Sequence, residues 1–391
     1  MDKRLKIGFF IDTYFPMVDG VVMVVHNYAS LLSEFADVTV FCPKVKDYAD
    51  NYPYRVVRCR TKNLFFLDYE FPSPKGDKAF QKQIADAGLD VVHIHSPFGV
   101  GASGARYAKK HGIPAIYTLH SQYKLDFLHY TKSRLLTAVC MNAIAKVFNK
   151  ADLLLTMNPA CRGLARAYGY KGEIKLLPNA TDLPVLENRD EVRRRTREKL
   201  GIGDREFLLI NVGRLSKVKN LAFAIKTVAE LKRKSVPAKL IVIGSGGDER
   251  YFKRLAEKSK VKDEVMFLGK ISDKDEKAAL FAAADLHIFP SFYDTDGIVR
   301  IEAAAAGTPT IGIEGSISAS AITNGVNGFT GANDPAQFAN LIAEIKNDPA
   351  RLAAAGRNAA QQLYHTWDKV VHDLTKIYND VILNKCATQK N

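Results

Sequence analysis

Two aspartates separated by one residue, Asp294 and Asp296, have the side-chain types and spacing that most directly suggest chemistry in this sequence. They lie in the stretch SFYDTDGIVRIEAAAAGTP, residues 291–309. One hypothesis is that the two carboxylates hold a divalent metal ion, because hard cations prefer oxygen ligands. A second is that Asp296 is simply the N-cap of a helix that begins near Gly297.

The start of that helix offers a third interpretation of the same stretch. Gly297 lets the backbone approach a ligand closely, because it has no side chain. The amides of Ile298 and Val299 would then point out of the helix N-terminus, where a phosphate group is favoured. The sequence therefore leaves three possibilities open here: a metal site, a helix cap, and a phosphate site.

Short runs rich in β-branched residues, which are typical of strands, recur along the whole chain between helix-like stretches. The first seven are Lys6–Ile11, Val38–Phe41, Val56–Cys59, Val91–His95, Ala115–Leu119, Leu153–Met157 and Ile174–Leu177. The next five are Phe207–Val212, Lys239–Ile243, Val265–Leu268, Leu286–Phe289 and Thr310–Ile313. This alternation predicts an α/β protein with parallel sheets covered by helices on both faces.

The alternation of strands and helices is interrupted once, by the charged stretch Glu187–Lys199, which we interpret as a solvated linker helix. We therefore expect two doubly wound, Rossmann-like domains, at residues 1–185 and 186–364. A helix within 365–391 is predicted to cross back to the first domain. Ligands of such sheets bind at the carboxyl ends of strands, so a cleft between the domains is the expected site.

Composition limits the classes of protein that fit. The 391 residues carry a net charge of +14, which favours anionic partners such as phosphorylated substrates, anionic lipid or nucleic acid. We find no nucleic-acid reading module and no interleaving of basic and aromatic residues, so we expect no nucleic-acid partner. Five scattered cysteines without a CxxC pattern favour a reducing compartment without a disulfide framework or zinc site. No signal peptide and no membrane-spanning helix are expected.

A second acidic pair, Asp294 and Glu302, belongs to a longer pattern of motifs. Asp294 and Glu302 are separated by seven residues and followed by AAAAGTP, which resembles the acidic-x7-acidic motif of glycosyltransferase family 4. Six other stretches agree in the order that the family has. They are DTYFPMVDGV (12–21), HIHSPFGVG (93–101), TLH (118–120), LLPNATD (176–182), NVGRLSKVKN (211–220) and VIGSGGD (242–248). The resemblance covers nearly the whole chain and implies a retaining, metal-independent enzyme with the GT-B architecture, two Rossmann-like domains facing a central cleft.

The resemblance also implies a role for each motif. His120, Asp294, Arg214 and Lys219 are the expected catalytic residues; Asp294 and His120 would contact the donor sugar. Arg214 and Lys219 would neutralise the departing diphosphate together with the helix amides, because a leaving group that gains charge needs cations and oriented dipoles. The full set of expected donor-binding residues is Gly20, Gly213, Arg214, Lys219, Gly244, Ile271, Gly297, Ile298, Val299 and Glu302.

Three further details of these motifs can be checked against a structure. Asp296 would repel a diphosphate unless Arg214, Lys219 or Arg300 compensates its charge. His93 and His95 would share one face of a strand, which raises a metal pair as an alternative to a strand-end role for His95. Glu302 is expected to accept hydrogen bonds from the ribose hydroxyls of a nucleotide.

The acceptor is less clear from the sequence. An apolar stretch that includes Phe65 and Phe66 and a basic segment with Lys132, Arg134 and Lys146 could contact an anionic membrane surface. Within the family this layout looks most like bacterial enzymes that glucosylate diacylglycerol. We therefore expect a UDP-sugar, most simply UDP-glucose, as donor and a membrane lipid as acceptor. The expected location is the cytoplasmic, inner face of the cell membrane, with the protein bound peripherally.

Two alternatives stay open at this point. The acceptor could be a polyprenyl-linked or soluble saccharide in cell-envelope polysaccharide synthesis. The protein could also be a catalytically idle binder of sugar nucleotides. Turnover of any donor would exclude the second alternative.

Overall fold

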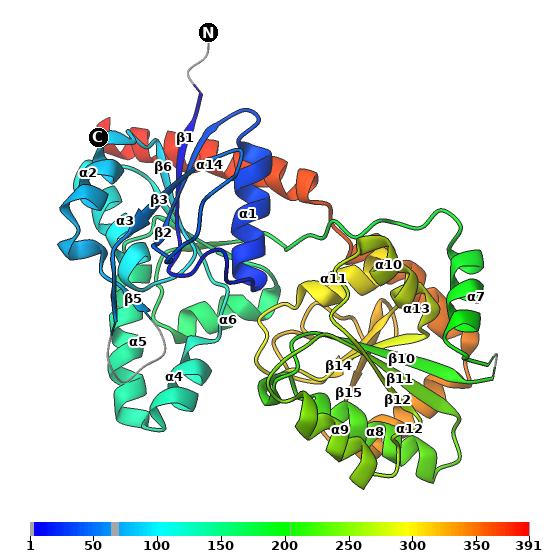
Figure 1. Ribbon diagram of the computed structural model, residues 1–391. Coiled ribbons are helices and arrows are strands. Elements are labelled where there is room, and N and C mark those ends of the chain that lie inside the picture. Colours follow the sequence, from blue (N-terminus) through cyan, green and yellow to red (C-terminus); the bar gives the residue numbers. More distant parts are fainter. Residues whose placement is uncertain (1–3, 64–69, 204, 391) are drawn as a thin grey trace. The chain divides into compact units, whose positions relative to one another are not determined.

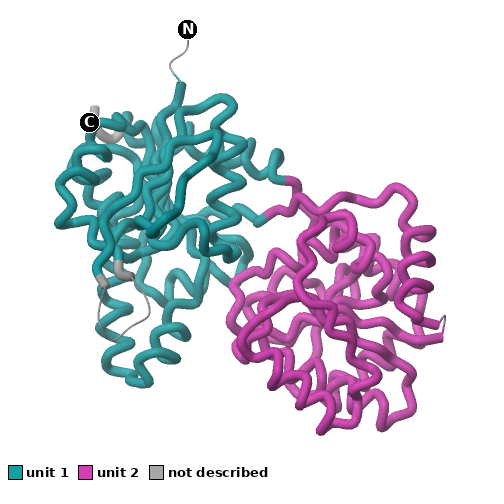
Figure 2. The backbone as a smooth tube through the Cα atoms, viewed as in Figure 1, with its two compact units in different colours: residues 1–179, 367–391 teal, residues 180–366 magenta. Residues whose placement is uncertain are grey.

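The computed structural model describes residues 4–63, 70–203 and 205–390, and the chain forms two compact units. Unit 1 consists of residues 1–179 together with 367–391, and unit 2 consists of residues 180–366 (Figure 2). Unit 1 is therefore discontinuous in sequence, because its last segment follows the whole of unit 2.

Unit 1 is built on a seven-stranded parallel sheet with the strand order β3-β2-β1-β6-β7-β8-β9 (Figure 1). Its strands are β1 (Lys6–Phe10), β2 (Asp37–Pro43), β3 (Arg55–Cys59), β6 (Val91–Ile94), β7 (Ala115–Thr118), β8 (Leu153–Thr156) and β9 (Glu173–Leu176). A separate antiparallel pair is formed by β4 (Thr61–Asn63) and β5 (Glu70–Pro72). The central strands are buried on both faces, which explains their continuous apolar sequences.

The helices of unit 1 are α1 (Gly20–Leu32), α2 (Lys78–Asp86), α3 (Gly99–His111), α4 (Tyr123–Thr131), α5 (Arg134–Phe148), α6 (Pro159–Ala167), α14 (Trp367–Lys390) and the short η1 (Pro74–Gly76). Helix α14 packs beside α1, where the rings of Tyr28 and Trp367 meet edge to face with centroids 5.7 Å apart (Figure 1). The C-terminal helix is thus part of the packing of unit 1.

Unit 2 repeats this architecture with a six-stranded parallel sheet in the order β12-β11-β10-β13-β14-β15. Its strands are β10 (Phe207–Val212), β11 (Ala238–Ile243), β12 (Val265–Gly269), β13 (Leu286–Phe289), β14 (Thr310–Ile313) and β15 (Gly328–Gly331). Its helices are α7 (Arg189–Lys199), η2 (Lys217–Lys219), α8 (Leu221–Arg233), α9 (Glu249–Lys258), α10 (Lys274–Ala283), α11 (Ile298–Ala305), α12 (Pro335–Lys346) and α13 (Pro349–Gln362).

The twelve predicted strands are confirmed within about one or two residues at their ends, and the α/β class is confirmed with them. Three strands were not predicted. β15 has the sequence GFTG, which has too few β-branched residues to be recognised, and β4 and β5 are only three residues long each.

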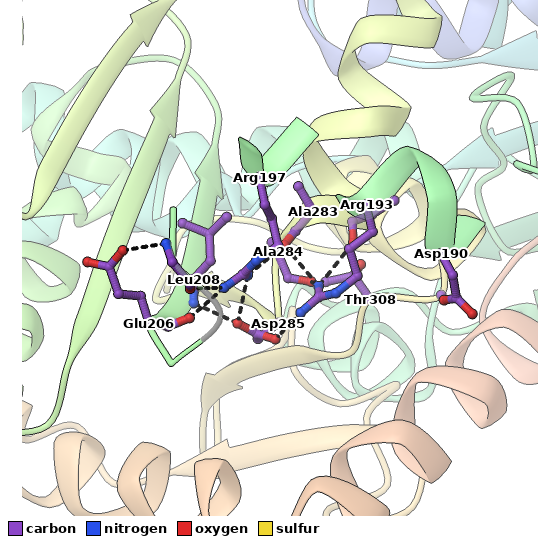
Figure 3. A network of polar contacts seen from close by, with 12 residues as sticks. Asp190, Arg193, Arg197, Glu206, Leu208, Ala283, Ala284, Asp285 and Thr308 are labelled. Atoms are coloured by element: carbon purple, nitrogen blue, oxygen red, sulfur yellow. Dashed lines mark hydrogen bonds and ion pairs between the residues drawn. The ribbon is translucent and has the colours of Figure 1, made fainter. Parts of the chain in front are cut away.

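Helix α7 corrects the interpretation of Glu187–Lys199 as a solvated linker. Arg193 donates to the carbonyl oxygens of Ala282, Ala283 and Ala284 and pairs with Asp285 at 2.5 Å (Figure 3). Arg197 is only 7% exposed and bonds to Asp285 and to the carbonyls of Gly203 and Glu206. These arginines satisfy the terminal carbonyls of α10. The charged composition was misleading because an arginine side chain can leave water when backbone carbonyl oxygens accept its hydrogen bonds.

None of the helices in the described part of the chain is both long and apolar enough to cross a membrane.

Candidate functional site

The strand order of unit 2 reverses between β10 and β13, and we call the region at the carboxyl ends of these two strands the crevice. From β10 the chain moves to β11 and β12 on one side, and from β13 it moves to β14 and β15 on the other. The loops after β10 and β13 therefore diverge at the carboxyl edge of the sheet, which is where doubly wound proteins bind ligands. The predicted donor-binding residues of this unit all follow β10, β11, β12 or β13.

An ion pair joins the two sides of this crevice. Lys219, at the end of η2 after β10, places its Nζ atom 2.5 Å from Oδ1 of Asp294, which follows β13. Two asparagines fix the same loops, since Asn220 donates to the carbonyl of Pro290 and Asn211 donates to that of Ile288. The structure thus brings together two of the four predicted catalytic residues.

Asp296 has a different partner, and it is not the N-cap of the following helix. Its Oδ1 atom lies 2.5 Å from Nη2 of Arg300, and the two side chains are only 2% and 4% exposed. The N-cap of α11 is Gly297, and no side chain bonds to the helix from that position. The helix-cap interpretation of Asp296 was therefore wrong, while the expected compensation of its charge comes from Arg300. Asp294 and Asp296 are thus each compensated by a different cation, Lys219 and Arg300.

The N-terminus of α11 keeps its backbone donors for a ligand. Gly297 has φ of 80°, a left-handed conformation, and a Cβ atom there would lie 2.6 Å from the ring of Phe289. Both the left-handed backbone conformation and the lack of space for a Cβ atom favour glycine here. The amides of Ile298 and Val299 follow, and the first amides of a helix have no partner within it. This geometry suits an anion.

Glu302 lies one turn further along α11 and is 8% exposed. Its Oε1 atom is 2.6 Å from Nζ of Lys277 on α10. Its Oε2 atom is buried and has no hydrogen-bond partner among the described residues. A buried carboxylate oxygen without a partner costs stability, so this atom is ready to accept a hydrogen bond from a ligand.

Three backbone loops pack closely at the same edge. Gly244 has φ of 137°, and a Cβ atom there would lie 1.9 Å from the carbonyl oxygen of Gly213. Backbone bonds join these loops, from Gly213 to Ile243 and from Gly244 to Gly269. The glycines therefore allow the loop after β10 to touch the loop after β11.

The remaining predicted residues of unit 2 border these loops. The Arg214 side chain is exposed and makes no hydrogen bond or ion pair within the described residues, so its guanidinium group is available to a ligand. Ile271 is half-buried after β12.

In unit 1 the predicted residue His120 is half-buried and adjoins two buried histidines, His93 and His95. Its Nε2 atom lies 2.9 Å from Nδ1 of His95, while His93 bonds to Thr118 at 2.6 Å and to the Tyr378 hydroxyl on α14 at 2.8 Å. Burial lowers the pKa of His120 to about 3, and burial followed by the neighbouring histidines lowers the pKa of His95. These rings are therefore neutral at pH 7. Both ring nitrogens of His93 are hydrogen-bonded to protein groups, which leaves it no nitrogen for a metal ion and argues against a His93–His95 metal pair. The contact of His120 with a donor sugar stays a prediction.

The corresponding helix start in unit 1 carries its own carboxylate. Asp12 follows β1 and accepts hydrogen bonds from the amides of Val100 at 2.7 Å and Phe98 at 3.2 Å and from the hydroxyl of Ser96 at 2.7 Å. The strand order β2-β1-β6-β7 reverses between β1 and β6, so Asp12 lies at the equivalent crevice of the unit 1 sheet. Sequence reasoning missed this role of Asp12, although its place after a strand was a usable signal.

Gly20 is the first residue of α1 rather than a turn residue, because Asp19 caps the helix by accepting from the amide of Val22. A Cβ atom at Gly20 would meet nothing within 4 Å. The close packing of unit 1 therefore does not require glycine there.

The predicted acceptor residues have mixed outcomes. Phe65 and Phe66 lie outside the described residues. Lys132, Arg134 and Lys146 are exposed on the hairpin formed by α4 and α5. The same hairpin exposes apolar side chains that were not singled out from the sequence. They are Leu128, Tyr130, Leu135, Leu136 and Val139, with Tyr130 81% and Leu135 75% exposed.

Lys277 was also missed from the sequence. It lies in the segment DKDEK, where alternating charges are typical of a solvated helix face, and only the fold places it against Glu302. The pairing of Asp296 with Arg300, by contrast, follows from i, i+4 spacing and could have been predicted.

Comparison with known proteins agrees with this geometry. Residues 18–184 match the family described as Glycosyltransferase Family 4, and residues 192–362 match Glycosyl transferases group 1. Two solved structures share the fold over almost their whole length. The HepE protein of Anabaena in complex with UDP has a TM-score of 0.76 at 18% identity and covers 96% of this chain and 100% of that chain. Sucrose-phosphate synthase from Thermosynechococcus elongatus has a TM-score of 0.79 at 20% identity, with coverages of 97% and 100%.

The fold and the matched families define a glycosyltransferase of the GT-B class. The chain belongs to glycosyltransferase family 4. It is 30% identical over 316 residues to the alpha-monoglucosyldiacylglycerol synthase of Streptococcus pneumoniae, covering 78% of this chain and 70% of that protein. It is 28% identical over 376 residues to the protein of the same name from Acholeplasma laidlawii, covering 91% and 92%.

Proposed function

We propose that this enzyme transfers a glucosyl group from a UDP-sugar to a membrane lipid such as diacylglycerol, with retention of anomeric configuration and without a metal ion. The observation that carries the proposal is the set of donors and cations at the crevice between β10 and β13. Two relatives named alpha-monoglucosyldiacylglycerol synthase support the choice of sugar and acceptor.

The charges of the crevice suit a nucleoside diphosphate. Lys219 and the exposed guanidinium group of Arg214 follow β10, and the amides of Ile298 and Val299 begin α11. Together they would bind the two phosphates and stabilise the negative charge that grows when the bond between the anomeric carbon and the phosphate oxygen breaks. Positive groups fixed in place before the reaction lower the barrier most effectively, because they need no reorganisation.

Two of the carboxylates that follow β13, Glu302 and Asp294, would recognise different parts of the donor. Glu302, held by Lys277, would accept the ribose hydroxyls through its Oε2 atom. Asp294 would contact the sugar, with Lys219 shared between this carboxylate and the diphosphate. A front-side reaction then completes the chemistry: the acceptor oxygen attacks the face that the diphosphate leaves, and its proton passes to a phosphate oxygen.

The membrane part of the proposal is supported by the hairpin of α4 and α5. Exposed apolar side chains beside Lys132, Arg134 and Lys146 suit the boundary of an anionic bilayer, where apolar groups insert and cations meet lipid phosphates. Peripheral binding at the inner face of the cell membrane is therefore part of the proposed function.

The test is release of UDP from UDP-glucose, with diacylglycerol vesicles present or absent and a chelator in both samples. Vesicle-dependent release in chelator, with an α-linked product by NMR, is the expected result. Release that needs added metal would contradict metal independence. Release only with a soluble or polyprenyl-linked saccharide would replace the acceptor, and no turnover of any donor would leave an idle binder of sugar nucleotides.

A further inference from the structure

An open pocket of ≈560 Å³ lies within unit 1, in the size range of ~300–1,000 Å³ that is usual for ligand sites. It begins at Phe98 and Gly99, where α3 starts after the carboxyl end of β6. Its other walls come from the segment 72–75 and from α4 and α5. The pocket therefore lies at the edge of the sheet where doubly wound units bind ligands.

The walls of this pocket are mainly apolar. Phe98 and Phe127 meet edge to face with ring centroids 6.2 Å apart, and Ile144 lies beside them. The charged side chains that line it are two cations, Lys75 and Arg106, and no acidic residue lines it within the described part of the chain. A saccharide would need several hydrogen-bonding groups, because polar hydroxyls buried without partners cost binding energy. An apolar chain needs none.

The helices that wall the pocket also carry the exposed apolar side chains of the hairpin. Helix α4 contributes Phe127 to the wall and exposes Tyr130, while α5 contributes Ile144 and exposes Leu135 and Val139. Residues 123–148 carry four cations, Lys124, Lys132, Arg134 and Lys146, against one acidic residue, Asp126, so the hairpin is cationic as well as apolar. The same two helices thus carry cations and exposed apolar groups that suit an anionic bilayer and contribute walls to an apolar pocket.

We infer that this pocket binds the acyl part of the lipid acceptor, which enters it from the bilayer under the α4–α5 hairpin. The inference rests on the proposed function and adds to it a binding site for the acceptor. It predicts that acyl chains determine which acceptors are used, because each methylene buried from water strengthens binding about fourfold.

Cys140 provides a direct probe of occupancy. It is a half-buried free thiol in the pocket wall, whereas Cys42, Cys59 and Cys161 are buried and Cys386 is exposed. In a Cys386→Ser protein, the rate of alkylation by N-ethylmaleimide should therefore report on Cys140. We expect dioctanoylglycerol at ten times its dissociation constant to slow alkylation about tenfold, because only the unoccupied pocket reacts. Glycerol at the same concentration should not slow it.

A matched pair of variants tests the position of the lipid. Ala143 lines the pocket and is exposed on α5, so Ala143→Phe should fill the pocket without disturbing the core. Ala138 is exposed on the same helix outside the pocket, so Ala138→Phe is the control. Protection by dioctanoylglycerol should disappear in the first variant and persist in the second. Protection that survives Ala143→Phe would overturn the inference.

Transfer from UDP-glucose to dioctanoylglycerol, measured on the same protein, separates the pocket from the proposed function. Transfer without protection of Cys140 would overturn the pocket and leave the function standing. Protection without transfer would support a lipid site and contradict the function. Slower alkylation at higher protein concentration without lipid would overturn the inference in favour of a second copy of this chain.

Discussion

At the scale of single residues, the crevice of unit 2 pairs each acidic group with its own cation. Asp294 is held by Lys219, Asp296 by Arg300 and Glu302 by Lys277. One of these pairs is buried and two are partly buried. Ion pairs of either kind contribute little net stability, so the three pairs are better explained by positioning. The pairing keeps acidic groups next to a proposed diphosphate site without an uncompensated negative charge.

Lys219→Met should lower kcat for UDP-glucose by about 100-fold, because removal of one group that stabilises a developing negative charge has effects of this size. Lys217→Met is the matched control, since Lys217 is exposed on the same η2 turn and lies over the ring of Tyr251. Steady-state kinetics check both. Equal losses in the two variants would show that disruption of η2, and not charge at the crevice, is responsible.

The buried histidines make the stability of unit 1 depend on pH. Burial lowers the pKa of His93 well below 6.5, so the unfolded chain binds a proton below about pH 6.5 that the folded chain does not. The free energy of unfolding should therefore fall as the pH falls below 6.5. His93→Gln should reduce this slope by up to about 1.4 kcal/mol per pH unit.

Urea unfolding between pH 5 and pH 7.5 measures this slope. Trp367, the single tryptophan of the chain, reports on unit 1 through its contact with Tyr28. An unchanged slope in His93→Gln would mean that His93 is protonated in the folded protein.

At the scale of elements, the starts of α3 and α11 show how one topology serves two purposes. Both helices begin at the crevice of their sheet, and α3 is capped there by the Asp12 carboxylate, whereas α11 begins at Gly297 without a side-chain cap. A helix start that already holds a carboxylate has little attraction left for a phosphate. This difference supports the placement of the donor diphosphate in unit 2.

The loop after β11 requires glycine at position 244 but not at position 247. Gly244→Ala should destabilise unit 2 and reduce activity together, because its Cβ would lie 1.9 Å from the Gly213 carbonyl oxygen at φ of 137°. Gly247→Ala should change neither by much, because a Cβ there meets nothing within 4 Å. Thermal unfolding and UDP release from UDP-glucose measure the two effects. A stable, active Gly244→Ala protein would contradict the close packing of these loops.

Helix α7 is anchored by charge, and one substitution should release it. Asp285→Asn leaves Arg193 and Arg197 without their carboxylate and should cost about 3 kcal/mol, as expected for one half of a partly buried pair. Arg194→Met is the control; its pairs with Glu191 and Glu198 are on the surface, so a change below about 0.5 kcal/mol is expected. Chemical denaturation of both variants checks the difference. Similar losses of unfolding free energy in the two variants would show that the bonds to Asp285 do not anchor α7.

The same elements show what the sequence could and could not predict. Strands such as Leu153–Thr156 were recognised because burial on both faces leaves an uninterrupted apolar run. β15 was missed because glycine has no side chain to show its burial. The residues of the crevice could be named from their motifs, but the contact of Lys277 with Glu302 could not, since it depends on how α10 packs against α11.

At the scale of the whole molecule, part of the net charge of +14 lies on the hairpin of α4 and α5. The hairpin of α4 and α5 combines exposed cations with exposed apolar side chains, which a purely electrostatic surface would lack. Binding to anionic vesicles should therefore weaken with salt but not vanish, because the apolar part is not screened.

Replacing Lys132, Arg134 and Lys146 together by Gln should weaken binding to phosphatidylglycerol vesicles by about 1 kcal/mol per cation. The matched control replaces Lys226, Lys234 and Lys258, three exposed lysines of unit 2, and removes the same total charge. Vesicle sedimentation at two salt concentrations measures the difference. Equal losses in both triple variants would show that net charge alone attracts the protein to the membrane.

The discontinuity of unit 1 has a consequence for how the protein is made. Ribosomes deliver the chain from its N-terminus, and domains generally fold as units during synthesis. Unit 2, residues 180–366, is complete before α14 emerges, whereas His93 and Tyr28 must wait for Tyr378 and Trp367. The first-synthesised half of the protein is thus the last to finish folding, and a released chain that ends before Trp367 should contain a native unit 2 and an incomplete unit 1.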